Sequence, residues 1–116
     1  MRVYLSGPVT GKAGGNRDEF RKAARSLREA GHRVLSPVEE IWPEATHEEA
    51  MLECLHRLTS LEKAYLPESI EVRPLFDALV RLPGWEGSAG ARLEVQVARA
   101  CGIAVADWDG EGVRWA

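Results

Sequence analysis

The sequence predicts an α/β fold in which a mostly parallel sheet of four to five strands is covered by helices on both faces. Short apolar runs rich in β-branched residues alternate along the chain with longer segments whose apolar residues recur at helical spacing. This alternation is typical of parallel sheets joined by right-handed crossovers. The 116 residues, of which 45% are hydrophobic, are enough to build a core. We therefore expect one domain over residues 1–116.

The first third of the chain is predicted to fold as strand, helix, strand. Residues 2–6 form a short β-rich run that Gly7 and Pro8 end. Asn16, followed three residues later by Glu19, predicts a capping box at the start of the first helix. Gly31 is expected to stop that helix. A second strand is then predicted over residues 32–36, because Pro37 follows it.

The middle of the chain carries a second helix between irregular segments. Residues 37–45 are predicted to form a loop, and Thr46 with Glu49 gives a second capping signal. Pro67 and Pro74 interrupt the pattern further on, so residues 66–75 are predicted to be irregular or a short extra helix. The expected apolar face of the second helix consists of Met51, Leu52, Leu55, Leu58 and Leu61.

The last third is predicted to complete the sheet. A third strand is expected over residues 77–82, before Pro83 and Gly84. The third helix should begin near Ala89 and end before Gly102. Residues 103–108 are predicted to form the fourth strand, and the tail after them could supply a short edge strand.

Charge and cysteine usage exclude several classes of function. The formal net charge is −3 and the basic residues are scattered, which argues against nucleic acid polymers and acidic membranes as partners. The apolar run at the N-terminus is too short for a signal peptide or a membrane span, so we expect a cytoplasmic protein. Cys54 and Cys101 lack the paired spacing of a zinc site and are predicted to be buried free thiols. No metal and no cofactor are expected.

Glu94 is the residue most suggestive of chemistry. It interrupts the apolar pattern of the third helix, and the small residues Ala91 and Ala98 flank it at helical spacing. A carboxylate near a helix N-terminus is stabilised as the anion, and an ionised carboxylate in a cleft can act as a nucleophile. By spacing alone, a surface acid that complements the helix dipole is the simpler interpretation.

Two glycine-containing turns indicate where a ligand could bind. Ser88 and the following backbone N–H groups could form an anion cradle, although Ser88 could equally be only a helix cap. Gly7, Thr10 and Gly11 could present N–H groups to a phosphate or a sugar, but their spacing is neither a Rossmann fingerprint nor a P-loop. Both turns follow strands of a parallel sheet, so we expect them side by side at one edge.

The remaining aromatic and histidine residues give weaker signals. Trp85 lies in a loop close to the expected site, where it could stack on a base or simply cover the edge of the sheet. His32, His47 and His56 show neither metal-ligand spacing nor a nucleophile partner, and no role is predicted for them.

Two stretches of the sequence resemble a known family. Residues 4–11, together with Asn16-Arg17, Phe20 and residues 31–34, look like the N-terminal half of proteins of the nucleoside 2-deoxyribosyltransferase-like superfamily. Residues 82–94 are similar to the second motif of its phage-type branch, DUF4406. The resemblance does not cover residues 38–75. It implies a flavodoxin-like fold, a three-layer α/β/α sandwich.

The resemblance also implies roles for single residues. Glu94 matches the catalytic glutamate, which attacks the anomeric carbon of a 2-deoxyribosyl group. Ser88 matches the serine with which nucleoside 5′-monophosphate N-glycosidases hold the phosphate, where deoxyribosyltransferases acting on free nucleosides have an aspartate. The candidate catalytic residue is therefore Glu94, and the candidate substrate-binding residues are Tyr4, Gly7, Val9, Thr10, Gly11, Ser88 and Gly90.

The chain departs from the family at two positions. Thr10 stands where the nucleotide glycosidases have an arginine. Ser69 stands where the family has an aspartate that assists the leaving base, and Glu68 or Glu71 could replace it. The resemblance further implies a homodimer or larger homo-oligomer in which a neighbouring subunit completes the site.

Three functions are open at this point. The first is cleavage or transfer of the N-glycosidic bond of a (deoxy)nucleoside 5′-monophosphate through a Glu94 glycosyl intermediate. The second is a nucleotide-binding module without turnover, such as a phage protein that sequesters or senses a nucleotide. The third is an interaction protein that retains only the fold. A second acid close to Glu94 would favour catalysis, because retaining glycosyl chemistry normally uses two carboxylates.

Overall fold

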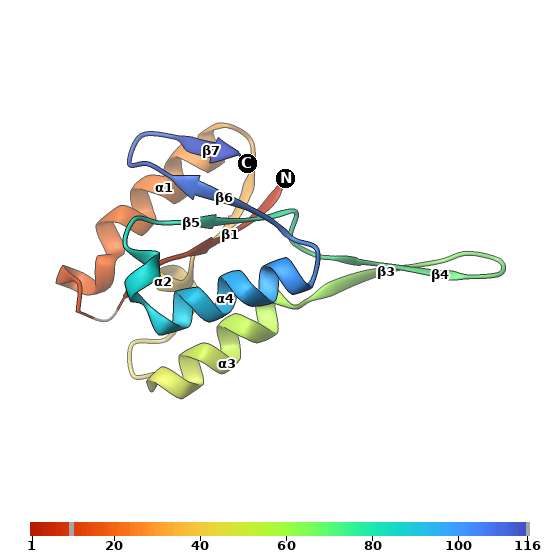
Figure 1. Ribbon diagram of the computed structural model, residues 1–116, viewed down its shortest axis with the longest axis horizontal. Helices are drawn as coiled ribbons and strands as arrows, with labels where there is room; N and C mark the ends of the chain where they lie inside the picture. Colours follow the sequence, from red (N-terminus) through yellow and green to blue (C-terminus); the bar gives the residue numbers. More distant parts are fainter. Residues whose placement is uncertain (10, 116) are drawn as a thin grey trace.

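The computed structural model describes residues 1–9 and 11–115, and its centre is a five-stranded sheet in the order β2-β1-β5-β6-β7 (Figure 1). The strands β1 (Arg2–Ser6), β2 (Arg33–Leu35), β5 (Ala78–Arg81) and β6 (Ala104–Trp108) are parallel. The edge strand β7 (Val113–Trp115) runs antiparallel to β6. This strand order is that of a flavodoxin-like fold, as predicted.

Helices cover both faces of the sheet and form two cores. The helix α1 (Arg17–Glu29) covers one face, where Val3 and Leu5 of β1 pack with Phe20. The helices α3 (His47–Leu58) and α4 (Ala89–Ala100) cover the other face, where Tyr4 packs with Leu58. Successive side chains of a strand point to opposite faces, so β1 contributes to both cores.

Of the two predicted capping boxes, the second is confirmed and the first is wrong. Thr46 accepts a hydrogen bond from the Glu49 backbone N–H, and the Glu49 side chain accepts one from the Thr46 N–H. Asn16 instead has a left-handed backbone, with φ 64°, and makes no side-chain cap bond. It ends a short 3-10 turn, η1 (Ala13–Asn16), and the Glu19 side chain accepts a 2.9 Å hydrogen bond from the Trp108 indole instead.

The second helix differs from the prediction in its apolar face and in its end. It stops at Leu58, because the hydroxyls of Thr59 and Ser60 bond to carbonyls of the last turn and the chain then becomes extended. Leu61 consequently belongs to a strand, and Leu52 is exposed. Within the predicted loop over residues 37–45, Pro37 begins the four-residue helix α2 (Pro37–Glu40).

The prediction of an irregular segment or a short helix over residues 66–75 holds for the turn at 66–69 but is wrong for 70–74, which form a strand. The strands β3 (Leu61–Tyr65) and β4 (Ile70–Pro74) form an antiparallel hairpin that projects from the body of the protein (Figure 1). Pro67 lies in the turn and Pro74 is the last residue of its strand, so neither proline interrupts the ladder.

Two smaller predictions are settled by burial. Cys54 is buried, as predicted, but Cys101 is exposed, because it follows the last residue of α4 at the surface. Trp85 starts the short 3-10 helix η2 (Trp85–Gly87) and packs against the core, with the Arg81 guanidinium 4.2 Å from its ring. It therefore covers the sheet. In the described part of the chain, no helix is both long and apolar enough to cross a membrane.

Candidate functional site

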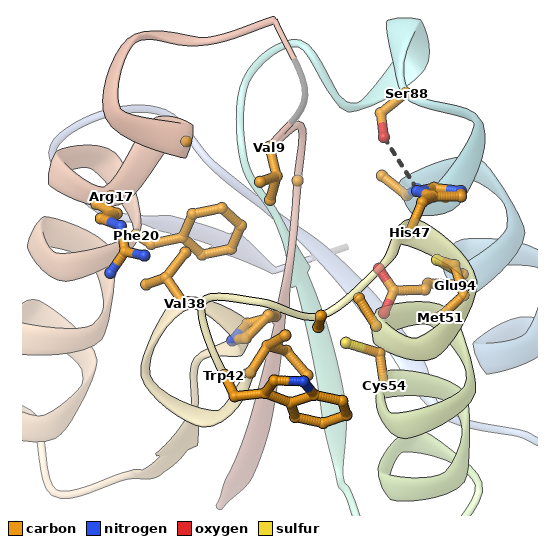
Figure 2. Close-up of a pocket in the computed structure, with 18 of the residues that line it drawn as sticks. Val9, Arg17, Phe20, Val38, Trp42, His47, Met51, Cys54, Ser88 and Glu94 are labelled. Atoms are coloured by element: carbon orange, nitrogen blue, oxygen red, sulfur yellow. Dashed lines mark hydrogen bonds between the residues drawn. The ribbon is translucent and has the colours of Figure 1, made fainter.

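A cavity of about 350 Å³ opens at the carboxyl edge of the sheet (Figure 2). Its walls come from the turn after β1, the start of α1, the segment from α2 into the first turns of α3, and the N-terminal half of α4. The volume is within the range of small-molecule sites, roughly 300–1,000 Å³. Gly7 and Ser88 both line this cavity, so the two glycine-containing turns lie at one edge of the sheet.

Glu94 lines the cavity with only 6% of its surface exposed. The Tyr4 hydroxyl donates a hydrogen bond to its Oε2 atom, and the Ser6 hydroxyl donates one of 2.9 Å to Oε1. Tyr4 and Ser6 are two residues apart on β1 and thus point to the same face of the sheet. Two side chains of β1 therefore hydrogen-bond to the two oxygens of the Glu94 carboxylate.

Burial gives Glu94 an unusual proton affinity. Removal from water raises its pKa to about 7, while the hydrogen bonds from Tyr4 and Ser6 act to lower it. Burial and the nearby Glu94 charge raise the pKa of the Tyr4 phenol, so Tyr4 stays protonated and acts as a donor. The site thus holds an oriented carboxylate that exchanges its proton near neutral pH, which suits a nucleophile or a general acid-base group.

Ser88 caps the helix α4 at the rim of the cavity. Its hydroxyl accepts a 3.2 Å hydrogen bond from the Ala91 N–H, which establishes the capping role. The N–H groups of Ala89 and Gly90 belong to the first turn of the helix, where backbone donors have no partner within the helix. Such donors can hold an anion, so capping and anion binding are compatible here.

The predicted glycine positions have different structural roles. A Cβ atom on Gly7 would lie 2.8 Å from Cβ of Leu82, so this glycine allows the turn after β1 to pack against the end of β5. A Cβ atom on Gly90 would lie 3.0 Å from Sδ of Met51, at the contact between α4 and α3. Gly11, with φ 80°, is exposed and is not among the residues lining the cavity, whereas Val9 lines it. Thr10 lies outside the described residues.

Several residues of the site, either lining the cavity or contacting Glu94 from behind it, were not predicted from the sequence. Ser6 was missed because its role depends on which helix faces β1. His47, Met51 and Trp42 come from the segment that the family resemblance does not cover. The one sequence signal for His47 is its position next to the Thr46 cap, which places it at a helix start. Arg17 stands at the first turn of α1, and Figure 2 shows it on the side of the cavity away from Ser88.

The cavity contains few ionisable groups. Among its described lining residues these are Arg17, His47, Cys54 and Glu94, so Glu94 is the one carboxylate. Burial raises the pKa of the Cys54 thiol, which therefore stays neutral. In the part of the chain that the structure describes, no group of three or more His, Cys, Asp or Glu side chains could hold a metal ion.

Glu68 and Glu71 do not replace the missing acid within the same chain. Glu71 pairs with Ala64 in the β3–β4 hairpin, and Glu68 lies in its turn. The hairpin projects on the side away from the start of α4 (Figure 1), whereas the cavity is lined by the N-terminal half of that helix. Ser69 lies in the same turn.

A family model matches most of the chain. The model of a family described as "Domain of unknown function (DUF4406)" matches residues 1–107, which include β1, α4 and every residue that lines the cavity. No curated protein and no solved structure matches the chain.

Proposed function

We propose that this chain, which belongs to the DUF4406 family, cleaves the N-glycosidic bond of a (deoxy)nucleoside 5′-monophosphate. The sugar would pass to water or to another base. One observation carries the proposal: the Glu94 side chain is buried in the wall of a ligand-sized cavity and both of its carboxylate oxygens accept hydroxyl hydrogen bonds. The resemblance to the nucleoside 2-deoxyribosyltransferase-like superfamily and its phage-type branch supports it, because Glu94 matches the catalytic glutamate there.

Glu94 acts as the nucleophile in this mechanism. Its carboxylate attacks the anomeric carbon, the bond from that carbon to the base breaks, and the bonding electrons leave with the base. Water or a second base then attacks the same carbon and releases the carboxylate. Tyr4 and Ser6 fix the orientation of the carboxylate throughout, and a pKa of about 7 leaves a substantial fraction of it ionised near neutral pH.

His47 is the best candidate to protonate the leaving base. Imidazole is the side chain that exchanges protons between about pH 5 and 8. The other ionisable groups of the described cavity wall are unsuited, because Arg17 does not release a proton and the Cys54 thiol is a weakened acid. Trp42, an exposed aromatic residue in the same wall, offers a ring on which a base could stack.

The phosphate is assigned to the start of α4. The Ser88 hydroxyl and the N–H groups of Ala89 and Gly90 offer donors there without a repelling carboxylate. Arg17 adds a guanidinium to the opposite wall of the cavity.

A nucleotide-binding module without turnover is the alternative. The observation that favours it is the single carboxylate of the described cavity wall, since retaining glycosyl chemistry normally uses two. Such a protein would bind a nucleotide in the same cavity, to sequester or to sense it, and would release no base.

One experiment separates these functions. A panel of nucleoside 5′-monophosphates and their nucleosides is incubated with the protein, released base is measured by chromatography, and binding is measured by calorimetry. We expect base release that Glu94→Gln abolishes, that His47→Gln reduces, and that Glu29→Gln, an exposed glutamate at the end of α1, leaves unchanged. Binding without release would support the alternative, and absence of binding to every member would contradict both.

A further inference from the structure

The β3–β4 hairpin, here called the arm (residues 61–74), is not accounted for by the proposed chemistry. It extends from the body of the protein along the longest axis of the molecule, whose dimensions with the arm included are 52 × 31 × 22 Å (Figure 1). Its two strands form a sheet of their own, separate from the central one. A two-stranded hairpin alone is at best marginally stable in water, so a projecting ribbon of this kind calls for a partner that covers it.

The arm has one apolar face and one polar face. In an antiparallel ladder, directly paired residues share a face. The pairs Leu61–Pro74, Lys63–Val72 and Tyr65–Ile70 therefore lie together on one face, and the pairs Glu62–Arg73 and Ala64–Glu71 lie on the other. Leu61, Tyr65, Ile70 and Val72 are each more than half exposed, and Tyr65 reaches 74%.

Contacts at the base of the arm fix its direction. The Glu62 carboxylate accepts hydrogen bonds from the guanidinium groups of Arg2 on β1 and of Arg73 on β4. The Leu75 N–H donates a 2.8 Å hydrogen bond to the Ser60 carbonyl, which closes the ribbon where it meets the body. The polar face is thus tied to the body at its base, while the apolar face is left open to solvent.

We propose that the apolar face of the arm packs against the same face of a second copy of this chain, around a two-fold axis. Four large apolar side chains that are more than half exposed present on the order of 500 Å² of surface, which is in the upper range for the largest patch on a monomer. Complete burial of this face on two arms would cover about 1,000 Å², the lower limit for a biological interface. A two-fold axis requires one self-complementary patch, and this face provides it.

Charge placement selects the register of the two arms. On the apolar face, the charged residue Lys63 lies one row closer to the body than the Tyr65–Ile70 pair. Glu68 lies in the turn, one row beyond that pair. A two-fold axis through the Tyr65–Ile70 row therefore sets each Lys63 over the turn of the other arm. There the Lys63 ammonium can pair with Glu68 instead of facing a second lysine.

Analytical ultracentrifugation at micromolar protein concentrations measures the mass of the assembly and so tests the interface. This test does not depend on any enzymatic activity. The wild type should have twice the mass of the 12.8 kDa chain. The double variant Tyr65→Thr, Ile70→Thr should be monomeric, because threonine keeps strand propensity but removes the apolar surface. The matched variant Ala64→Thr, Glu71→Thr, on the opposite face, should remain a dimer. Circular dichroism and thermal unfolding check that the body stays folded in both.

A charge swap tests the register. Lys63→Glu should weaken association at least ten-fold, and adding Glu68→Lys should restore most of the loss. A wild type that sediments as a monomer, or an apolar-face variant that associates like the wild type, would overturn the interface. If the double variant Lys63→Glu, Glu68→Lys associates no more tightly than Lys63→Glu alone, the proposed register is wrong.

Discussion

Ser6 and Glu94 are 88 residues apart in the sequence, and the serine hydroxyl donates a 2.9 Å hydrogen bond to Oε1 of the buried carboxylate. This contact joins the first strand of the sheet to the helix that follows the third parallel strand. Because the Tyr4 hydroxyl occupies the other carboxylate oxygen, Glu94 has little freedom to rotate. Orientation of this kind lowers the entropic cost of reaching a reactive geometry.

The stability of the protein should fall as pH rises through neutrality, and Glu94→Gln should remove that dependence. The pKa of Glu94 is raised from 4.5 to about 7 in the fold, so the folded chain keeps a proton that the unfolded chain loses. The resulting stabilisation is fully present below about pH 4.5 and is lost as pH passes about 7, a change on the order of 3 kcal/mol.

Urea unfolding at a series of pH values checks this prediction. The quantity to compare is the difference in unfolding free energy between wild type and Glu94→Gln, because other carboxyl groups titrate equally in both proteins. Parallel profiles for the two proteins would show that Glu94 is ionised at neutral pH like a surface acid.

Tyr4→Phe should raise the pKa of Glu94 further. The hydrogen bond from Tyr4 acts to lower that pKa, and phenylalanine keeps the ring packing against Phe76 while removing the donor. Carbon-13 NMR titration of the Glu94 carboxyl measures the shift directly, whether or not the protein is active. Ser6→Ala should shift it in the same direction, whereas Tyr65→Phe on the exposed arm should leave it unchanged. A Glu94 titration unmoved by Tyr4→Phe would contradict the assigned donor.

Ser88→Asp should weaken nucleotide binding and affect nucleosides less. Aspartate caps a helix as well as serine does, so the fold should be kept, but its charge would repel a phosphate bound at the start of α4. The loss should be roughly 1–3 kcal/mol, the range for charge-assisted contacts. Calorimetric titration with a nucleotide and its nucleoside measures it, and the neutral cap Ser88→Asn is the control. Equal weakening for both ligands would place the phosphate elsewhere.

Gly7→Ala should destabilise the protein by about 1–3 kcal/mol. The new Cβ atom would lie 2.8 Å from Cβ of Leu82, a fully buried side chain that has no room to move. Gly87→Ala is the matched control, since a Cβ atom there meets no described atom within 4 Å. Thermal unfolding of the two variants measures the difference in stability. Similar melting temperatures would mean that the turn after β1 can shift without loss of stability.

The elements of the central sheet could be predicted because their signals are local. Residues 2–6 carry their own β pattern, and Thr46 with Glu49 determines a helix start within four residues. The arm could not be predicted in this way, because Pro67 and Pro74 interrupt strands only when they lie inside the ladder, and here they lie at its turn and its end. The capping box predicted at Asn16 does not form, because Gly14 and Gly15 have left-handed backbones that determine how the chain enters α1.

The candidate site could be predicted where a residue broke a pattern or where a glycine-containing turn followed a strand, as at Gly7 and Ser88. Glu94 was found because a carboxylate in an apolar helix is unusual. The burial of Glu94 and its hydrogen-bond partners depend on the packing of α4 against β1. That packing cannot be read from the sequence of either element alone. His47 lines the cavity because Gly90 lets the start of α3 approach α4, and such an approach between distant segments leaves no local signal.

The alternation of side chains along β1 divides one strand into two independent sets of positions. Val3 and Leu5 belong to the core under α1, and Tyr4 and Ser6 contact Glu94. A protein engineer could therefore randomise Tyr4 and Ser6 to alter the acidity of the carboxylate while leaving the α1 core untouched, or repack Val3 and Leu5 to adjust thermal tolerance alone. Deleting one residue within the strand would exchange the two sets, so this segment should tolerate substitutions far better than changes of length.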